Sequence, residues 1–379
     1  MNRRPFVWAL IGSGAIPIPP KGWGAVEGLI WDYKVYLEEL GHKVVIVNTS
    51  NRREIIDAVA RCRPDIVHLH WELCGGVLGK INAPVKIVTS HHAVKYARKI
   101  AFLLLARNFR EYLRNGLICL VLSPVWKKTF IDSGHNPSEV FVSMNGVDHR
   151  KFRFRETPLH DDRSICLGMI HPLKRQDVVQ TIDSVDFVGP MGVMGAKTTF
   201  DKARKNYLGE WTRDYIHEHL SDYANLVLLS ESESCAPLVV LEALVCGLGV
   251  VVSSAAAVNL DTRQPWISVI PEEKITDTGF VEAEIARNRE IALRHRRQIR
   301  EYGIANFSWE KLIPRYADLC LKLHDEKIRR QDFFARKRDT LHRLCRVLPF
   351  FHRLVHEWLL AYCPFWLRRL LLKASGRSG

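Results

Sequence analysis

Several common sequence patterns are missing from this chain, and each absence excludes a class of site. No two of its nine cysteines have Cys-x-x-Cys spacing, so the sequence indicates neither a zinc site nor a disulfide framework. The glycine-rich run at 189–197 lacks the Gly-Lys-Ser/Thr ending of a phosphate-binding P-loop. The apolar run at 354–367 has 14 residues and contains His356 and Glu357, so it is too short to span a bilayer. Unpaired cysteines favour a reducing cytoplasm.

Length and composition predict a globular protein with more than one core. The chain has 379 residues, of which 47% are hydrophobic and 25% charged, as expected for two domains of ~150 residues plus an appendage. The short apolar stretch near the N-terminus precedes Gly12, Gly14 and Pro17, so we interpret it as a first strand and its loop rather than a signal peptide. Residues 325–379 carry a net charge of +8 out of +14 in total, so the basicity belongs mainly to this tail.

The alternation of apolar runs with helical patterns predicts an α/β fold with two Rossmann-like doubly wound domains facing a cleft. Short, nearly continuous apolar runs are typical of parallel strands covered on both faces. Such runs occur at 5–14, 43–49, 65–71, 85–92, 117–123, 164–170, 185–190, 224–230, 249–254 and 267–271. Helical patterns lie between them at 26–41, 50–63 (with Ser50 as its cap), 174–183, 212–220 and 237–246. In such folds ligands bind at the carboxyl ends of the strands.

The segment at 230–254 places carboxylates directly before an apolar run that must be buried. It reads SESESCAPLVVLEALVCGLGVVVSS, and its helix is expected to begin near Pro237. A helix N-terminus offers unpaired N–H groups to an anion, and carboxylates beside it can accept hydrogen bonds from the hydroxyls of a sugar or ribose. Together these groups suit a nucleotide sugar. Glu231 and Glu233 could equally be solvated loop charges, whereas Glu242 interrupts an apolar helix face and needs a partner.

This segment resembles the donor-site signature of the retaining GT-B-fold glycosyltransferases of family 4 (group 1), in which a Glu precedes a helix that bears a second Glu. Further segments are similar to other family motifs, in the family's order, over about residues 6–320. They are PPKGWGAVE (a glycine loop), DIVHLH and VKIVTSHH (inner strands), VSMNGVDHRKF (the turn opening the second domain), LGMIHPLKRQD (a strand and its loop) and FSWEKLIPRY (the closing helix). The resemblance implies transfer of a sugar from a nucleotide-sugar donor to a glycan or lipid-linked acceptor with retention of configuration, in cell-surface polysaccharide or glycolipid synthesis.

The resemblance also implies which residues would hold the donor's phosphates. Lys174 would bind the diphosphate, a cation placed where negative charge grows as the nucleotide leaves. Arg175 stands next to it. The amides of Leu238 and Val239, which follow Pro237, would cradle the same phosphates.

Other matching residues would contact the sugar and the ribose. Glu242 would bind the ribose hydroxyls, and Glu233 those of the transferred sugar close to the reacting carbon. Gly24 and Ala25, where the family has two glycines, would allow close backbone approach across the cleft. His91 matches a family histidine that faces the sugar.

Two departures from the family pattern affect the donor site. Met169 stands where the family usually has Arg, and Arg175 is the candidate to replace that cation. Seven residues usually separate the two family glutamates. Counting back from Glu242 gives Ser234, whereas Glu233 leaves eight residues between, so either of these two occupies the first glutamate position.

The resemblance suggests four parts of the chain: an acceptor domain at 1–155, a donor domain at 156–305, a closing helix at 306–325 and a basic amphipathic helical tail at 326–379. Basic residues combined with Trp, Phe and Leu in the tail are typical of an interfacial helix on an anionic membrane. We therefore expect a cytoplasmic protein that contacts the cytoplasmic face of a membrane. The alternative is that the tail packs on the body as an extra helix pair.

Metal and cofactor use can be judged from a missing motif. No two aspartates are two residues apart, so the Asp-x-Asp of metal-dependent glycosyltransferases is absent, and we expect neither a metal nor a cofactor. In the family's reaction, the departing phosphate would take the proton of the acceptor.

The alternatives to a glycosyltransferase are a sugar-nucleotide epimerase or phosphorylase, since the fold hosts both, and a catalytically degenerate member that binds membranes or partners. Nucleic-acid binding ranks last because the basic charge lies among amphipathic leucines.

Three aromatic side chains have two interpretations each. His68 and His70 alternate along an expected strand and could bind a metal, but no third ligand is near in the sequence, so a structural role is favoured. Trp23 could stack on an acceptor sugar or anchor its loop.

Overall fold

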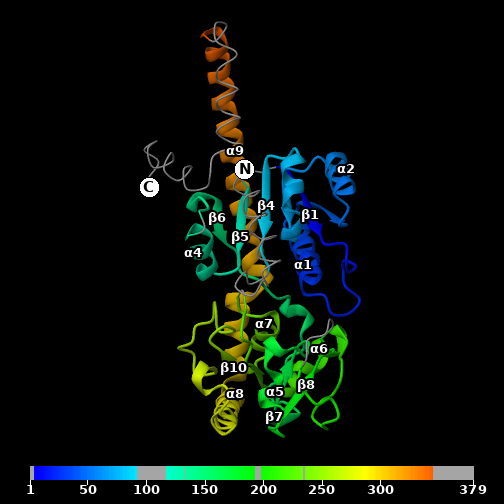
Figure 1. Cartoon of the computed structure of the whole chain (residues 1–379), viewed down its shortest axis with the longest axis vertical. Helices are drawn as coiled ribbons and strands as arrows, with labels where there is room; N and C mark the ends of the chain where they lie inside the picture. The colour runs from blue at the N-terminus through cyan, green and yellow to red at the C-terminus, as the bar shows by residue number, and fades with distance from the viewer. Residues whose placement is uncertain (1–3, 92–116, 133, 193–197, 234, 345–379) are drawn as a thin grey trace.

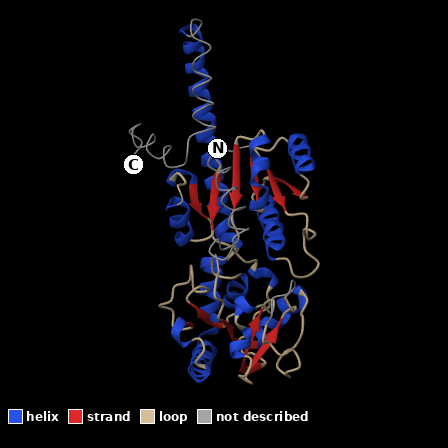
Figure 2. Ribbon diagram, viewed as in Figure 1, coloured by secondary structure: helices blue, strands red, loops and turns tan. Residues whose placement is uncertain are grey.

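The computed structural model describes residues 4–91, 117–132, 134–192, 198–233 and 235–344. Within them the chain forms two parallel β-sheets, each covered by helices, and the two domains are stacked along the long axis of the molecule (Figure 1). The strand arrows of the first sheet point toward the second domain (Figure 2), so the loops after these strands reach the junction between the domains. The predicted pair of Rossmann-like domains is therefore confirmed.

The first sheet has six strands in the order β2-β1-β3-β4-β5-β6, all parallel. Its strands are β1 (Val7–Gly12), β2 (Lys43–Asn48), β3 (Ile66–Leu69), β4 (Val85–Thr89), β5 (Ile118–Val121) and β6 (Val140–Val142). Alternate side chains enter two separate cores, as the two-residue period of a strand requires. Its helices are α1 (Ala25–Glu39), α2 (Arg52–Cys62), the 3₁₀ helix η1 (Glu72–Lys80) and α4 (Pro124–Asp132). The core under α1 contains Trp8 and Leu10, and the core under α2, η1 and α4 contains Ala9 and Ile11.

The second sheet has five parallel strands in the order β11-β10-β9-β7-β8. Its strands are β7 (His160–Leu167), β8 (Val185–Val188), β9 (Tyr223–Leu228), β10 (Gly249–Ser253) and β11 (Ile267–Ile270). Its helices are α5 (Gln176–Val179), α6 (Arg213–His219), α7 (Leu238–Val245) and α8 (Thr278–Phe307). Every residue of β9 and β10 is buried, which explains why these strands are continuous apolar runs in the sequence.

Three local features differ from the sequence-based expectations. β6 is missing from the predicted strands, because it has only three residues, which pair with β5. β7 begins at His160, four residues before the predicted apolar run at 164–170, because its first residues are exposed beside β9. The cap of α2 is Asn51 rather than Ser50, because the Asn51 side chain accepts from the N–H groups of Arg53 and Glu54.

The last described helix, α9 (Trp309–Leu344), returns the chain to the first domain. Its buried residues Trp309, Ile313, Tyr316 and Cys320 join the core under α1. The helix then runs past this domain and projects beyond it (orange in Figure 1). The predicted closing helix and the first part of the predicted tail thus form one continuous helix, and residues 345–379 of the tail lie outside the described residues.

Candidate functional site in the interdomain cleft

A cavity of about 470 Å³ lies between the two domains. The first domain lines it with the loop before α1 and the start of α1, including Gly24 and Ala25. The second domain lines it with the start of α6 and with one face of α7, including Leu238, Val239 and Glu242. Linker residues within 146–152 complete the lining. The structure thus brings the predicted cleft-loop residues and three predicted donor-binding residues to one cavity.

The N-terminus of α7 is held rigidly at this cavity. Pro237 is its cap, and the first helical hydrogen bonds run from the N–H groups of residues 240 and 241 to the Pro237 carbonyl, at 2.9 and 3.3 Å. The N–H groups of Leu238 and Val239 precede these bonds, at the positive end of the helix. At the other end, Arg296 and Arg300 of α8 donate to the carbonyls of residues 246 and 245, at 3.4 and 2.5 Å. Cations at a helix C-terminus stabilise it.

Lys174 points at the loop that precedes α7. It ends the 3₁₀ turn η5 (Pro172–Lys174), and its Nζ forms an ion pair with Oε1 of Glu233. The Lys174 side chain is 30% exposed and that of Glu233 is 15% exposed. The N–H of Glu231 donates to the carbonyl of Leu173 at 2.8 Å, which fastens the loop to the turn. The structure therefore brings these two predicted residues together at the loop before α7, but neither is among the residues that line the cavity.

Two other predicted donor residues are placed differently. Nη2 of Arg175 lies 2.6 Å from Oε1 of Glu272, so part of its guanidinium is engaged with a carboxylate outside the cavity lining. Met169 is 41% exposed, and its carbonyl accepts from Gln176 at 2.8 Å. Ser234 lies outside the described residues. Which residue supplies the second cation, and which fills the first glutamate position, therefore stay predictions.

Glu242 is paired with Arg213, which belongs to the first turn of α6. Nη2 of Arg213 lies 2.6 Å from Oε1 of Glu242, and Nη1 lies 3.3 Å from Oε2. Burial lowers the pKa of Arg213, but the charge and hydrogen bonds of Glu242 more than offset this, so the pKa is raised overall. The sequence showed that Glu242 needs a partner without showing which. Arg213 lies 29 residues earlier on another helix, so only the tertiary fold brings the two together.

Three histidines form a stack at the carboxyl edge of the first sheet. His68 contacts the hydroxyls of Tyr316 and Thr89 through its two ring nitrogens, at 2.9 and 2.6 Å. Nδ1 of His70 lies 3.2 Å from Nε2 of His91. Burial lowers the pKa of His68 and His70 well below the ordinary value, and the neighbouring histidines lower it further. Neutral rings that bond to other side chains fit the structural role that we favoured for His68 and His70.

The side chain of Trp23, a residue of the first domain, contacts the second domain. It belongs to the loop before α1, yet its partly buried ring packs against the hydrophobic core of the second domain. Its indole N–H is buried and has no hydrogen-bond partner among the described residues. These contacts favour the interpretation of Trp23 as an anchor of its loop.

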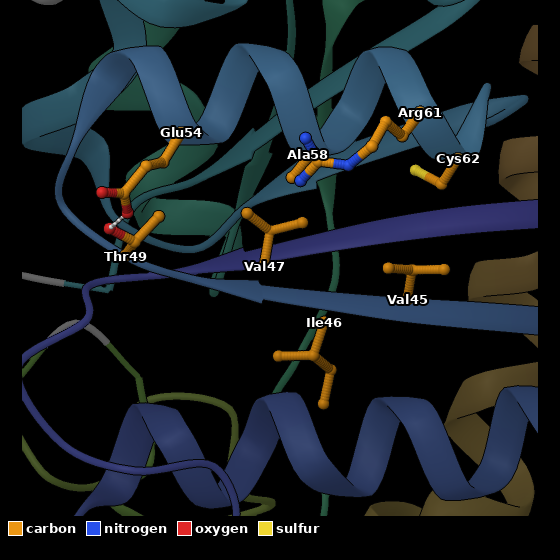
Figure 3. Close-up of a pocket in the computed structure, with 8 residues that line it drawn as sticks. All are labelled: Val45, Ile46, Val47, Thr49, Glu54, Ala58, Arg61 and Cys62. Atoms are coloured by element: carbon orange, nitrogen blue, oxygen red, sulfur yellow. Dashed lines mark hydrogen bonds between the residues drawn. The ribbon is translucent and has the colours of Figure 1, made fainter.

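A second hollow lies at the outer edge of the first domain, between the edge strand β2 and helix α2 (Figure 3). Half of its lining residues are aliphatic, namely Val45, Ile46, Val47 and Ala58, and the other half are Thr49, Glu54, Arg61 and Cys62. The carboxylate of Glu54 accepts from Thr49 at 2.7 Å and so is engaged within this hollow. We assign no role in the proposed chemistry to this hollow, because it contains none of the predicted site residues.

Two features that are absent from the described part of the chain bear on metals and membranes. Among the described residues, no group of three or more His, Cys, Asp or Glu is arranged to hold a metal ion. No helix within that same part is both long enough and apolar enough to span a bilayer. Metal independence itself stays a prediction.

No family model matches the chain, and no curated protein matches its sequence. Solved structures do match its fold. Sucrose-phosphate synthase from Thermosynechococcus elongatus superposes with a TM-score of 0.67 at 16% identity, covering 86% of this chain and 100% of that one. AviGT4, a glycosyltransferase involved in avilamycin A biosynthesis, gives 0.61 at 17% identity, covering 85% and 99%. Anabaena HepE in complex with UDP gives 0.61 at 14% identity, covering 84% and 100%.

These structures establish the fold class of the chain. Each aligns over more than four fifths of it and over nearly all of its own length, so both domains and their arrangement are shared. The chain has the GT-B fold, as the sequence predicted. At identities below 20%, the fold is what the likeness shows, and the chemistry must be argued from the cleft.

Proposed function

We propose that this chain is a retaining glycosyltransferase of family 4, which transfers a sugar from a nucleotide-sugar donor to a glycan or lipid-linked acceptor. One observation carries the proposal: the N-terminus of α7 and Glu242 lie in the interdomain cavity, with Lys174 directed at the loop before the same helix. A helix N-terminus and a lysine can bind a diphosphate together, while a carboxylate one turn further on can accept from ribose hydroxyls. HepE, which shares the fold, has been solved with UDP and with UDP-glucose, which supports a nucleotide-sugar donor here.

In the proposed reaction, the bond between the anomeric carbon of the sugar and the phosphate oxygen breaks. A bond from that carbon to the acceptor oxygen forms on the same face, and the acceptor's proton passes to the departing phosphate. Lys174 and the amides of Leu238 and Val239 stabilise the charge that develops on the diphosphate. Because these groups supply positive charge, we propose a metal-independent reaction without a cofactor. Glu233 and His91 orient the sugar, and closure of the cleft excludes water.

The decisive experiment is a thermal-shift screen of the purified chain against UDP, GDP, ADP and their glucose or mannose derivatives. The proposal expects that one nucleotide series raises the unfolding temperature and that its sugar nucleotide is then turned over in the presence of acceptor glycans. Lys174→Ala should abolish the shift by the diphosphate. Conversion of the donor sugar to its epimer, without transfer, would instead favour the epimerase alternative.

A specific observation favours a second candidate, a catalytically degenerate protein that binds membranes or partners. Met169 is exposed where a family member would have a cation, and part of the Arg175 guanidinium pairs with Glu272. A degenerate protein would show no turnover of any nucleotide sugar, even with added acceptor. This candidate would be excluded if the wild type turns over a nucleotide sugar and its nucleotide binding is lost in Lys174→Ala.

We further propose that the tail at 326–379 places the protein at the cytoplasmic face of an anionic membrane, where a lipid-linked acceptor for surface polysaccharide or glycolipid synthesis would be found. The projection of α9 beyond the first domain supports this, because the first part of the tail, residues 326–344, belongs to that helix (Figure 1). Co-sedimentation with vesicles of phosphatidylglycerol and phosphatidylcholine tests it. The full chain should pellet with the anionic vesicles and an Arg368→Glu/Arg369→Glu variant should not, whereas equal pelleting of both would reject tail-mediated binding.

A further inference from the structure

Arg213 and Glu242 make a two-point contact on the wall of the interdomain cavity. Each terminal nitrogen of the guanidinium meets a different oxygen of the carboxylate, at 2.6 and 3.3 Å. A planar guanidinium that opposes a carboxylate in this way fixes the plane of the carboxylate as well as its position. Both side chains line the cavity, so the contact decides which acceptor sites of Glu242 face a ligand.

Among the basic residues that line the cavity, Arg213 is the one that pairs with Glu242. The Glu242 side chain is only 7% exposed on an otherwise apolar helix, where a carboxylate needs a charged or hydrogen-bonding partner. Lys151, another cation on the cavity wall, is bonded to Asp32 at 2.7 Å. His217, also on the wall, has its pKa lowered to about 4 by burial and by the charge of Arg213, so it is neutral near pH 7.

The pairing leaves Glu242 with acceptor capacity toward the cavity. An ionised carboxylate has about four lone-pair sites, and Arg213 occupies two of them. The remaining sites can accept hydrogen bonds from two adjacent hydroxyls, the arrangement found in a ribose. A nucleotide that lacks the 2′-hydroxyl would leave one of these sites unpaired inside a half-closed cavity, which costs affinity.

We propose that Arg213 is the positioning residue of the ribose site, a proposal that rests on the proposed function. It holds the Glu242 carboxylate in a fixed orientation, and Glu242 then selects ribonucleotides over 2′-deoxyribonucleotides. Arg213 acts through Glu242 and does not itself contact the diphosphate. Its loss therefore removes the discrimination between ribose and deoxyribose rather than the affinity for phosphate.

Calorimetric titration of the full chain with UDP and 2′-deoxy-UDP tests the proposal, and GDP and ADP with their deoxy forms are titrated in parallel. The wild type should bind the ribonucleotide of its preferred base roughly tenfold more tightly than the deoxy form, the size expected for one hydrogen bond to a charged acceptor. Arg213→Met should reduce this ratio of affinities to about one, mainly by weakening the binding of the ribonucleotide. Arg213→Lys should restore part of it, because one donor and the charge remain. Glu242→Gln should reduce the ratio even if Arg213→Met fails to fold.

The pair Arg163–Asp186 provides a closely matched control. It also bridges two elements of the second domain with two contacts, and its exposures of 31% and 7% nearly equal the 30% and 7% of Arg213–Glu242. Arg163→Met should leave the ratio at the wild-type value, whatever it does to stability. Equal weakening of UDP and deoxy-UDP by Arg213→Met would overturn the proposal, because it would mean direct contact with phosphate. A wild-type ratio of one would overturn it while leaving the proposed function standing, and no binding of any nucleotide would reject both.

Discussion

Lys174 and Glu233 form an ion pair in front of helix α7. Their ion pair joins the turn after β7 to the loop before α7, and both side chains are largely shielded from solvent. The proposed function assigns Lys174 to the diphosphate and Glu233 to the transferred sugar. In that case neither side chain can keep its present partner when the donor binds, and the diphosphate must compete with Glu233 for the lysine.

This competition makes a prediction that separates the two residues. Glu233→Gln should tighten the binding of a nucleoside diphosphate several-fold, because Lys174 no longer has to leave a carboxylate. The same change should lower sugar transfer by at least about tenfold, because the sugar loses a charged acceptor. Lys174→Met should instead weaken the binding of the nucleoside diphosphate. Calorimetric titration and a transfer assay with the sugar nucleotide measure the two effects.

The pair Lys34–Glu38 on α1 serves as the control for this experiment, since it is another lysine–glutamate pair outside the cavity lining. Glu38→Gln should leave the diphosphate affinity unchanged. If Glu233→Gln binds the diphosphate more weakly than the wild type, the carboxylate is helping to build the site rather than competing for it.

Gly146 is required by the way α9 returns to the first domain. A Cβ at this position would lie 2.6 Å from the buried ring of Trp309, which bonds to Asp32 at 3.0 Å and has no room to move. Gly146→Ala should therefore lower the free energy of unfolding by about 1–3 kcal/mol through overpacking. Urea unfolding measures the change. Gly76→Ala, where a Cβ meets nothing within 4 Å, should change it by less than about 0.5 kcal/mol.

The sequence predicts the strands better than it predicts the pairings in the cleft. Strands such as β9 and β10 can be recognised in the sequence as continuous apolar runs, because both faces of each strand are buried. β6 escapes detection because three residues carry too little periodicity. For Glu242, the pattern demands a partner, but no local signal indicates Arg213, because that contact depends on how α6 packs beside α7. For Arg175, the motif suggested a phosphate contact but could not show the carboxylate of Glu272, because Glu272 lies 97 residues further along the chain and only the fold brings it to the guanidinium.

His217 makes stability depend on pH in a known direction. Burial and the positive charge of Arg213 lower its pKa to about 4, below the ordinary value of 6.5, while Glu242 and Asp214 oppose the shift and Lys151 adds to it. As the pH falls through 6.5, the unfolded chain therefore binds a proton at His217 that the folded protein does not bind. The stabilising contribution is complete above pH 6.5 and is progressively lost between pH 6.5 and 4.

Replacing this histidine should flatten that dependence. At pH 5 the His217 contribution to the loss should be about 2 kcal/mol, so His217→Gln should lose correspondingly less stability than the wild type between pH 7 and 5. Urea unfolding at pH 7, 6 and 5 gives the comparison. Parallel curves for the two proteins would show that the pKa of His217 is the same in the folded and unfolded states.

Trp23 should control how far the two domains separate. Trp23 belongs to the loop before α1, and its ring packs against the core of the second domain. Its indole N–H is buried without a hydrogen-bond partner among the described residues. Trp23→Ala removes this apolar contact, worth about 2 kcal/mol for a partly buried aromatic ring, and should shift the free protein toward an open arrangement with a larger radius of gyration. Trp23→Phe keeps most of the contact and removes the unpaired donor, so it should scatter like the wild type. Small-angle X-ray scattering distinguishes these cases, and equal radii for the alanine variant and the wild type would mean that the linker and α9 alone hold the cleft closed.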